Sequence, residues 1–137
     1  MKSQIFFPVC VIRIKEFIFF FVISGDYSTA KLYLRKLRHL MKSKKFLIIH
    51  EEPTLLRLIF SFFEDTYIHN VVLIESPTRA IIDVLFLFNK DRAVAVGING
   101  SYIKAVNYIF RNFITLNYPF NKIDSYPLEL RCSLTTV

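Results

Sequence analysis

The sequence predicts an α/β fold: a doubly wound parallel sheet of three or four strands. Two observations carry this prediction. Short apolar runs alternate with segments whose apolar residues recur at helical spacing, in the order strand, helix, strand, helix, strand, helix. The clearest run, residues 46–49, stops at Glu51, Glu52 and Pro53, as a buried strand followed by a turn and a helix does. Such an alternation is typical of parallel strands joined by right-handed crossovers, with helices on both faces.

The length of 137 residues suits one core, so we expect a single domain, residues 41–137, behind an apolar and then basic extension, residues 1–40. The extension holds seven of the 18 Lys and Arg residues but only two of the 11 acids. Because Met41 stands directly before the first clear strand, a start at Met41 behind an adventitious leader is an alternative. Cys10 and Cys132 lie far apart without a metal-ligand pattern, which predicts reduced thiols in a cytoplasmic protein.

Residues 5–24 resemble a membrane segment in composition, but Arg13, Lys15 and Glu16 divide them into two short apolar runs. A spanning helix needs about 20 predominantly apolar residues, and each central charge costs about 2.5 kcal/mol. The pattern therefore favours a buried strand pair, or an extension without a folding role, over a transmembrane span.

Residues 28–41 are expected to form a helix, with Ser28 as its N-cap and Leu32, Leu37, Leu40 and Met41 at helical spacing. Its polar side and the residues after it are basic. A basic amphipathic helix can lie on an anionic membrane or touch phosphate backbones, although most such faces are simply solvated. The predicted basic contact face comprises Lys31, Arg35, Lys36, Arg38, Lys42, Lys44 and Lys45.

The remaining elements are predicted from the spacing of apolar residues and from the residues that typically begin or end a helix or strand. After Pro53, a helix is expected up to Glu64, and a β-branched run predicts a strand over 71–74. Ser76-Pro77 is a helix start signal, which predicts a helix up to Asn89. A third strand is then expected over 93–98 and a third helix over 102–113, while the alternation in 128–134 predicts a half-exposed edge strand.

Three segments resemble the receiver domain of bacterial response regulators, whose sheet is of the flavodoxin and CheY type. FLIIHEEPTLLRLIFSFFED looks like the first strand, acidic turn and first helix of that family. VVLIESPTRAIIDVL resembles the second strand and helix, and AVAVGINGS resembles the third strand and the loop after it. The resemblance covers residues 42–113 and omits the last part of the family's sheet.

The resemblance implies phosphoryl transfer to an aspartate after the third strand, assisted by Mg²⁺ on the acids after the first strand. By position, His50, Glu51 and Glu52 fall on the acidic cluster, and Asn99 falls on a residue whose carbonyl binds the metal. Gly97 falls on the phosphoacceptor and has no nucleophile. The resemblance thus implies a degenerate receiver that is not an enzyme, has no cofactor beyond weak Mg²⁺, and acts in the cytoplasm by contacts with a signalling protein.

The leading alternative is a small protein that docks on a membrane surface through residues 5–45. A metal-dependent enzyme using His50, Glu51 and Glu52 is disfavoured, because adjacent residues leaving a strand point in different directions. The three glycines form no phosphate-binding loop, and no motif for sequence-specific nucleic-acid binding is present. A truncated receiver remnant that exposes part of its sheet is a further alternative.

Overall fold

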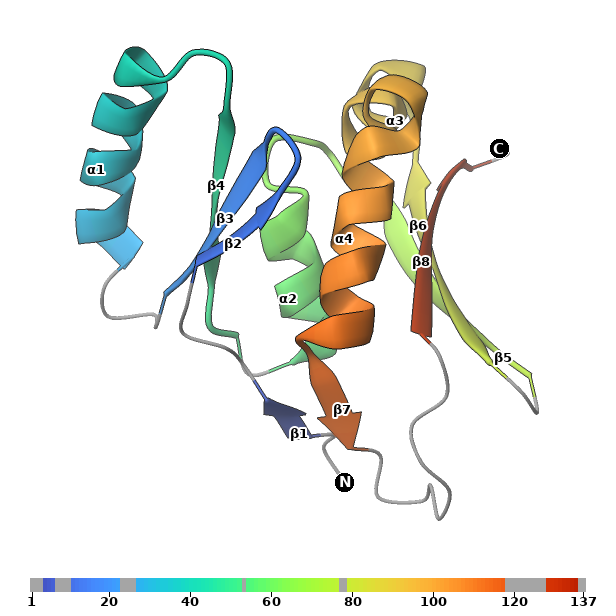
Figure 1. The fold of residues 1–137 in the computed structure, drawn as a ribbon. Coiled ribbons are helices and arrows are strands. Elements are labelled where there is room, and N and C mark those ends of the chain that lie inside the picture. The colour runs from blue at the N-terminus through green and yellow to red at the C-terminus, as the bar shows by residue number, and fades with distance from the viewer. Residues whose placement is uncertain are drawn as a thin grey trace. The chain divides into compact units, whose positions relative to one another are not determined.

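The computed structural model in Figure 1 describes residues 4–6, 11–22, 27–52, 54–76, 79–117 and 128–135. The chain divides into two compact units. The first unit comprises residues 7–62, and the second comprises residues 63–137 together with residues 1–6. The boundary expected between residues 40 and 41 falls inside the first unit.

The first unit is built on a three-stranded mixed sheet of order β2-β3-β4. β2 (Val11–Ile14) and β3 (Phe17–Val22) form an antiparallel hairpin, and β4 (Lys45–His50) lies parallel to β3. Lys15 and Glu16, two of the charges that interrupt the apolar stretch, form the turn of this hairpin, where Lys15 has φ 52°. Of the two alternatives left open for this stretch, a buried strand pair and an extension without a folding role, the structure shows the strand pair.

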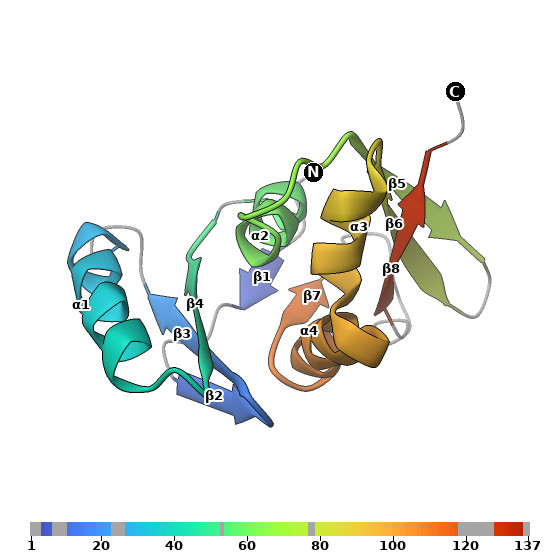
Figure 2. The same cartoon turned by 90° about the horizontal axis from the view of Figure 1, so that it is seen from above.

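Helices cover both faces of this sheet (Figure 2). On one face, α1 (Tyr27–Leu40) crosses from β3 to β4 and places Leu34 against Phe46 and Ile48. On the other face lies α2 (Leu55–Phe62), whose Phe62 ring centroid is 6.0 Å from that of Phe19 on β3. Because β3 is the central strand and carries alternate residues into both cores, residues 17–22 are integral to the fold.

The second unit contains another three-stranded mixed sheet, of order β5-β6-β8. β5 (Asn70–Glu75) and β6 (Ala80–Phe86) are antiparallel, and β8 (Leu128–Leu134) lies parallel to β6. Between β6 and β8 the chain forms α3 (Asn89–Val96), a 3-10 turn (Ile98–Gly100) and α4 (Ser101–Asn112). A separate two-stranded pair joins β1 (Gln4–Phe6) to β7 (Thr115–Asn117).

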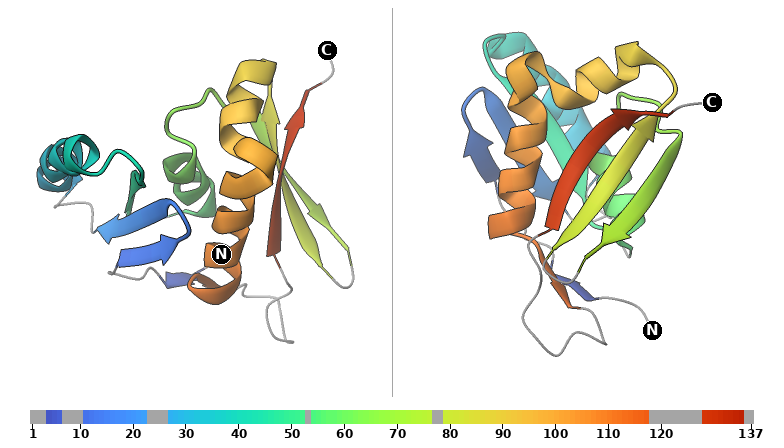
Figure 3. Two further views of the ribbon diagram at one scale, coloured as in Figure 1. Left: turned by 45° about the horizontal axis from the view of Figure 1, so that its top comes forward. Right: turned by 90° about the vertical axis from the view of Figure 1, so that its right-hand side faces the viewer.

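Both α3 and α4 lie on the same side of the β5-β6-β8 sheet (Figure 1). They cover the face formed by alternate buried residues of β6 and β8, namely Ala80, Ile82, Val84, Phe86, Leu130 and Cys132. Figure 3, right, shows the opposite face, which carries no helix of this unit. On that face Ile81 and Leu85 of the central strand β6 are partly exposed, whereas Asp83 between them is buried.

The predicted doubly wound parallel sheet is wrong, because the chain forms two separate mixed sheets in an α+β arrangement. The helix expected over 76–89 is strand β6, and Ser76 and Arg79 close a hairpin turn through the bond from Ser76 N–H to Arg79 C=O at 2.9 Å. The strand expected over 93–98 is the end of α3. The observed order therefore differs from the one on which the receiver resemblance depended.

Other elements agree with the sequence predictions. The helix expected over 28–41 is α1, although it begins at Tyr27, so Ser28 lies inside the helix and is not its N-cap. The run at 46–49 is the core of β4, and the helix after Pro53 is α2. The third predicted helix is α4, and the predicted half-exposed edge strand is β8. Residues 71–74 lie in β5, although this strand pairs antiparallel with its neighbour rather than parallel.

Candidate functional site

The end of β4 brings together two of the predicted metal ligands. His50 is the last residue of β4, and its Nδ1 lies 2.6 Å from Oε1 of Glu52. The Glu51 side chain is exposed, and its backbone N–H donates to Val22 C=O at 2.8 Å, which extends the pairing of β4 with β3. The strand end is thus held by backbone pairing and by one imidazole–carboxylate contact.

Gly97 and Asn99 belong to the second unit, in the turn between α3 and α4. Gly97 is the C-cap of α3, with φ 79° and ψ 170°, and does not end a strand. Asn99 has φ 55°, and its carbonyl accepts a hydrogen bond from Lys104 Nζ at 3.3 Å. The assignment of Gly97 to the end of a third strand is therefore wrong.

The observed residues do not fit a Mg²⁺ site at the end of β4. Mg²⁺ needs near-octahedral oxygen ligands. Of the two carboxylates at this strand end, Glu52 already contacts an imidazole nitrogen and Glu51 is exposed. In the part of the chain that the structure describes, no three His, Cys, Asp or Glu residues gather closely enough to hold a metal ion. We therefore derive no chemistry from a metal at this position.

The predicted basic contact face lies along α1 and the turn after it. Lys31, Arg35, Lys36, Arg38, Lys42 and Lys45 are exposed, and Lys44 is half-buried. Two of these groups also stabilise the first unit, because Arg38 Nη2 donates to Phe46 C=O at 2.8 Å and Lys45 Nζ lies 5.6 Å from the Phe17 ring centroid. Arg35, Lys36 and Lys42 therefore carry most of the charge that is open to a partner.

Large apolar side chains on α1 are also exposed. Leu32 is 64% exposed and Leu40 76%, and Tyr33 and Met41 are exposed as well. Leu32, Lys36 and Leu40 follow each other at four-residue spacing, so they form one ridge on the side of α1 away from Leu34. This ridge was not predicted, because the sequence pattern grouped Leu32 and Leu40 with Leu37 and Met41 on one apolar side of the helix.

An ion pair lies at the centre of the helix-free face of the second sheet. Asp83 of β6 is opposite Arg131 of β8 in the strand register, and Asp83 Oδ2 lies 3.1 Å from Arg131 Nη2. Asp83 is only 9% exposed, and its Oδ1 is buried without a hydrogen-bond partner among the described residues. The Arg131 side chain is half exposed. The pair is therefore asymmetric. Removing Arg131 would leave a buried carboxylate without its partner, whereas removing Asp83 would leave Arg131 in contact with solvent.

We predict that Arg131→Met lowers the free energy of unfolding by about 2 kcal/mol, because it leaves a buried carboxylate unpaired. Asp83→Leu should cost less than about 1 kcal/mol, since Arg131 then remains solvated and the leucine lies beside apolar neighbours. Urea unfolding of both single variants and of the double variant measures the coupling. Equal losses from the two single variants would contradict this asymmetry.

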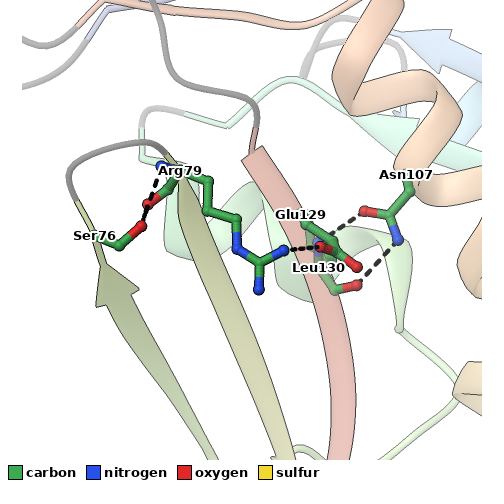
Figure 4. Close-up of polar contacts among 5 residues, drawn as sticks. All are labelled: Ser76, Arg79, Asn107, Glu129 and Leu130. Atoms are coloured by element: carbon green, nitrogen blue, oxygen red, sulfur yellow. Dashed lines mark hydrogen bonds and ion pairs between the residues drawn. The ribbon is translucent and has the colours of Figure 1, made fainter.

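The open edge of β8 is closed by side chains from the helices. Asn107 of α4 accepts from Leu130 N–H at 2.7 Å and donates to Leu130 C=O at 3.0 Å (Figure 4). Arg92 Nε of α3 donates to Cys132 C=O at 3.2 Å. On the neighbouring strands, Arg79 and Glu129 lie 3.8 Å apart in an exposed ion pair (Figure 4). The helices thus satisfy edge groups of β8 that would otherwise be free to pair with another strand.

Cys132 is buried on the helix-covered face of the same sheet. Burial raises the pKa of its thiol from 9.0 to about 12, Arg92 lowers the pKa, and Asp83 raises it further. Burial likewise raises the pKa of Tyr102. The Cys132 thiol is therefore protonated at neutral pH, so it is a packing residue and not an activated nucleophile.

We predict that stability falls as pH rises above 9. The unfolded thiol then loses its proton while Cys132 in the folded state keeps it up to pH of about 12, so the thiol's contribution falls by about 1.4 kcal/mol per pH unit in this window. Urea unfolding from pH 8 to 11 should give a shallower decline for Cys132→Ala than for the parent chain. Parallel pH profiles for the two proteins would contradict the prediction.

None of the helices in the described part of the chain is both long enough and apolar enough to cross a bilayer.

Comparison with protein-family models finds no match. Comparison with curated proteins finds none either. Among solved structures, the crystal structure of APE1850 matches with a TM-score of 0.54 and 15% sequence identity, over 85% of this chain and 79% of that one. At this identity the likeness concerns the fold alone.

Proposed function

We propose that this protein associates peripherally with anionic lipid surfaces through the outer side of α1. The observation that carries the proposal is the pairing of an exposed apolar ridge with a basic ridge on one helix. The apolar ridge contains Leu32 and Leu40, and the basic ridge follows Lys31, Arg35, Arg38 and Lys42 at spacings of four, three and four residues. α1 carries no acidic residue that would oppose an anionic partner.

The two ridges fit an in-plane position of α1 on a bilayer. Leu32 and Leu40 can enter the boundary between headgroups and acyl chains, where each leucine side chain that is buried contributes about 1.5 kcal/mol or more. Each Lys or Arg near an anionic membrane contributes about 1 kcal/mol. Lys36 lies between the leucines, and its Nζ is 5.9 Å from the Tyr33 ring centroid. Because a lysine side chain is long and flexible, its ammonium can extend to the headgroups while the leucines enter the bilayer.

The first unit supports α1 on a rigid base. Leu34 is buried and packs against Phe46 and Ile48 of β4, and Ala30 and Leu37 are partly buried on the same side. Phe17, Phe19 and Phe21, which the sequence placed in a docking segment, are buried in the first unit. The proposed lipid-binding surface is therefore narrower than residues 5–45 and consists of α1 with Met41 and Lys42.

Phosphate groups of nucleic acids would satisfy the basic ridge equally well, but the apolar ridge favours lipid. Exposed leucines gain nothing beside a phosphodiester backbone, whereas they lose unfavourable contact with water at a bilayer. Binding to lipid should therefore depend on Leu32 and Leu40, and binding to nucleic acid should not. Mutation of the two leucines tests this difference.

The experiment is sedimentation with vesicles of phosphatidylcholine, alone or with about one third phosphatidylglycerol. We expect binding to the anionic vesicles only, and weakening by salt. Leu32→Gln/Leu40→Gln should reduce the partition coefficient by about 100-fold, and Arg35→Gln/Lys42→Gln should reduce it by about 30-fold. The matched control is Lys104→Gln/Arg111→Gln, which removes the same charge from exposed positions of α4.

Failure to bind anionic vesicles, or equal binding to neutral ones, would reject the proposal. A second arm measures binding to single-stranded and duplex oligonucleotides. Tighter binding there than to vesicles, unchanged by Leu32→Gln/Leu40→Gln, would assign the basic ridge to nucleic acid instead.

A further inference from the structure

The four outer strand edges of the two sheets differ in how they are protected against pairing with another strand. β4 and β8 follow the helical crossovers, and helix side chains bind their outward backbone groups: Arg38 on Phe46, Asn107 on Leu130 and Arg92 on Cys132. β2 carries a charged residue, Arg13, within the strand, which is a common protection of edge strands.

Among the described residues, no helix side chain binds an outward backbone group of β5, and no charged residue lies inside the strand. Its sequence, NVVLIE, contains no proline and no lysine or arginine, and its single charge is at the last position. Side chains on both faces of the strand are exposed, with Val72 37%, Leu73 47% and Ile74 42% exposed. A long apolar edge of this kind is a template for strand addition.

The ladder with β6 shows which backbone groups of β5 are open. Ser76 N–H donates to Arg79 C=O, so the even-numbered residues of β5 direct their backbone groups to β6. Val71, Leu73 and Glu75 therefore direct theirs outward. Of these groups, the Val71 N–H is satisfied locally, by the exposed side chain of Asn70 at 2.9 Å.

We propose that a second copy of this chain pairs antiparallel with β5, so that the two β5-β6-β8 sheets form one continuous sheet. A two-fold axis at Leu73 places Leu73 opposite its copy and Val71 opposite Glu75, which matches outward groups with outward groups. Val72 then lies opposite Ile74, and Asn70 opposite Ser76. About six main-chain hydrogen bonds form in this register, two of them only after the Asn70 side chain releases the Val71 N–H.

The side chains fit this self-pairing. The apolar residues occupy its centre, the polar residues its two ends, and the two Glu75 carboxylates lie far apart. Each Glu75 has His69 of the other copy as a diagonal neighbour, which is within reach of an ion pair when the imidazole is protonated. A strand from a different protein would need the same arrangement of apolar central and polar terminal residues. A second copy of this chain has that arrangement, and it is present wherever the first copy is.

The test uses the full chain in sedimentation velocity from about 1 µM to about 300 µM. We expect a reversible dimer with a dissociation constant in the micromolar range, because edge pairing buries a small interface. Leu73→Lys places a charge at the two-fold axis, and Leu73→Pro removes an outward N–H without touching the ladder to β6. Each should weaken dimerisation at least tenfold. The control is Val94→Lys, which makes a comparable change at an exposed position of α3.

A second measurement does not depend on the folding of those variants. In a Cys10→Ser background, a short bismaleimide cross-linker should join two copies of Leu73→Cys into a covalent dimer, and should not join two copies of Val94→Cys. A chain that stays monomeric throughout the concentration range overturns the proposal. So does a dimer that resists both Leu73 variants, one that Val94→Lys weakens equally, or equal cross-linking from positions 73 and 94.

Discussion

Replacing Phe19 by alanine is expected to lower the free energy of unfolding of the first unit by about 4 kcal/mol. Phe19 lies on the central strand β3 and is completely buried. Its ring packs against Phe62 of α2 at 6.0 Å and against Phe17 at 6.2 Å between centroids. Removing it leaves a cavity between the sheet and α2 that neither element can close without losing other contacts.

The matched control is Phe60→Ala, on the same unit and with the same change in side chain. Phe60 is 42% exposed on α2, so its loss should cost about 1 kcal/mol or less. Urea unfolding monitored by circular dichroism measures both variants. Unchanged stability of Phe19→Ala would mean that the first 40 residues are an appendage, as the sequence suggested, and that β3 contributes nothing to the fold.

The sequence predicted elements well where one pattern had one structural meaning. α4 is an example, because Val106, Ile109 and Phe110 recur at helical spacing and are buried in the structure. The hairpin of β2 and β3 was only one of two alternatives for residues 5–24, beside an extension without a folding role, although charges at Lys15 and Glu16 suit a turn that reaches solvent.

Sequence-based prediction failed where one pattern was compatible with both a helix and a strand. The residues of β6, AIIDVLF, contain apolar positions at helical spacing, but they are also a run of strand length that is rich in β-branched residues and apolar except for Asp83. Ser76-Pro77 decided the prediction for a helix, whereas Ser76 bonds to Arg79 across a hairpin turn. With β6 assigned as a helix, AVAV in residues 93–96 became the only candidate for the next strand.

The candidate surfaces were less predictable than the elements. The basic residues of α1 were identified directly, but the exposed ridge through Leu32 and Leu40 depends on which side of the helix faces β4. The pairing of Asp83 with Arg131 depends on strand register, and the open edge of β5 depends on strand order. Neither register nor order can be obtained from local periodicity, because both are set by contacts between distant segments.

The largest difference between the sequence-based hypothesis and the structure concerns Gly97. In the receiver resemblance this glycine stands where a phosphoacceptor aspartate has been lost, so Gly97→Asp would restore a missing group at no structural cost. In the structure Gly97 has φ 79° and ψ 170°, a backbone conformation that is essentially restricted to glycine. A Cβ atom at this position would lie 2.7 Å from the backbone nitrogen of Tyr102.

We therefore expect Gly97→Ala and Gly97→Asp to lower the free energy of unfolding by at least about 3 kcal/mol each, through backbone strain and the contact with α4. Tyr102 is buried against Phe63, with ring centroids 5.8 Å apart, so α4 cannot shift without disturbing the core of the second unit. Thermal and urea unfolding measure the loss.

Gly100→Ala provides the control within the same turn. Gly100 also has a positive φ, of 73°, but a Cβ there would meet only the flexible end of Lys104 at 3.5 Å. Gly100→Ala should lower the free energy of unfolding by about 1 kcal/mol, which is the usual cost of placing alanine in the left-handed region. If Gly97→Asp were as stable as the parent chain, the turn between α3 and α4 would have to differ from the one observed. A loss at Gly97 much larger than at Gly100 means that this glycine is kept for backbone geometry, and that its presence is no evidence of a lost phosphorylation site.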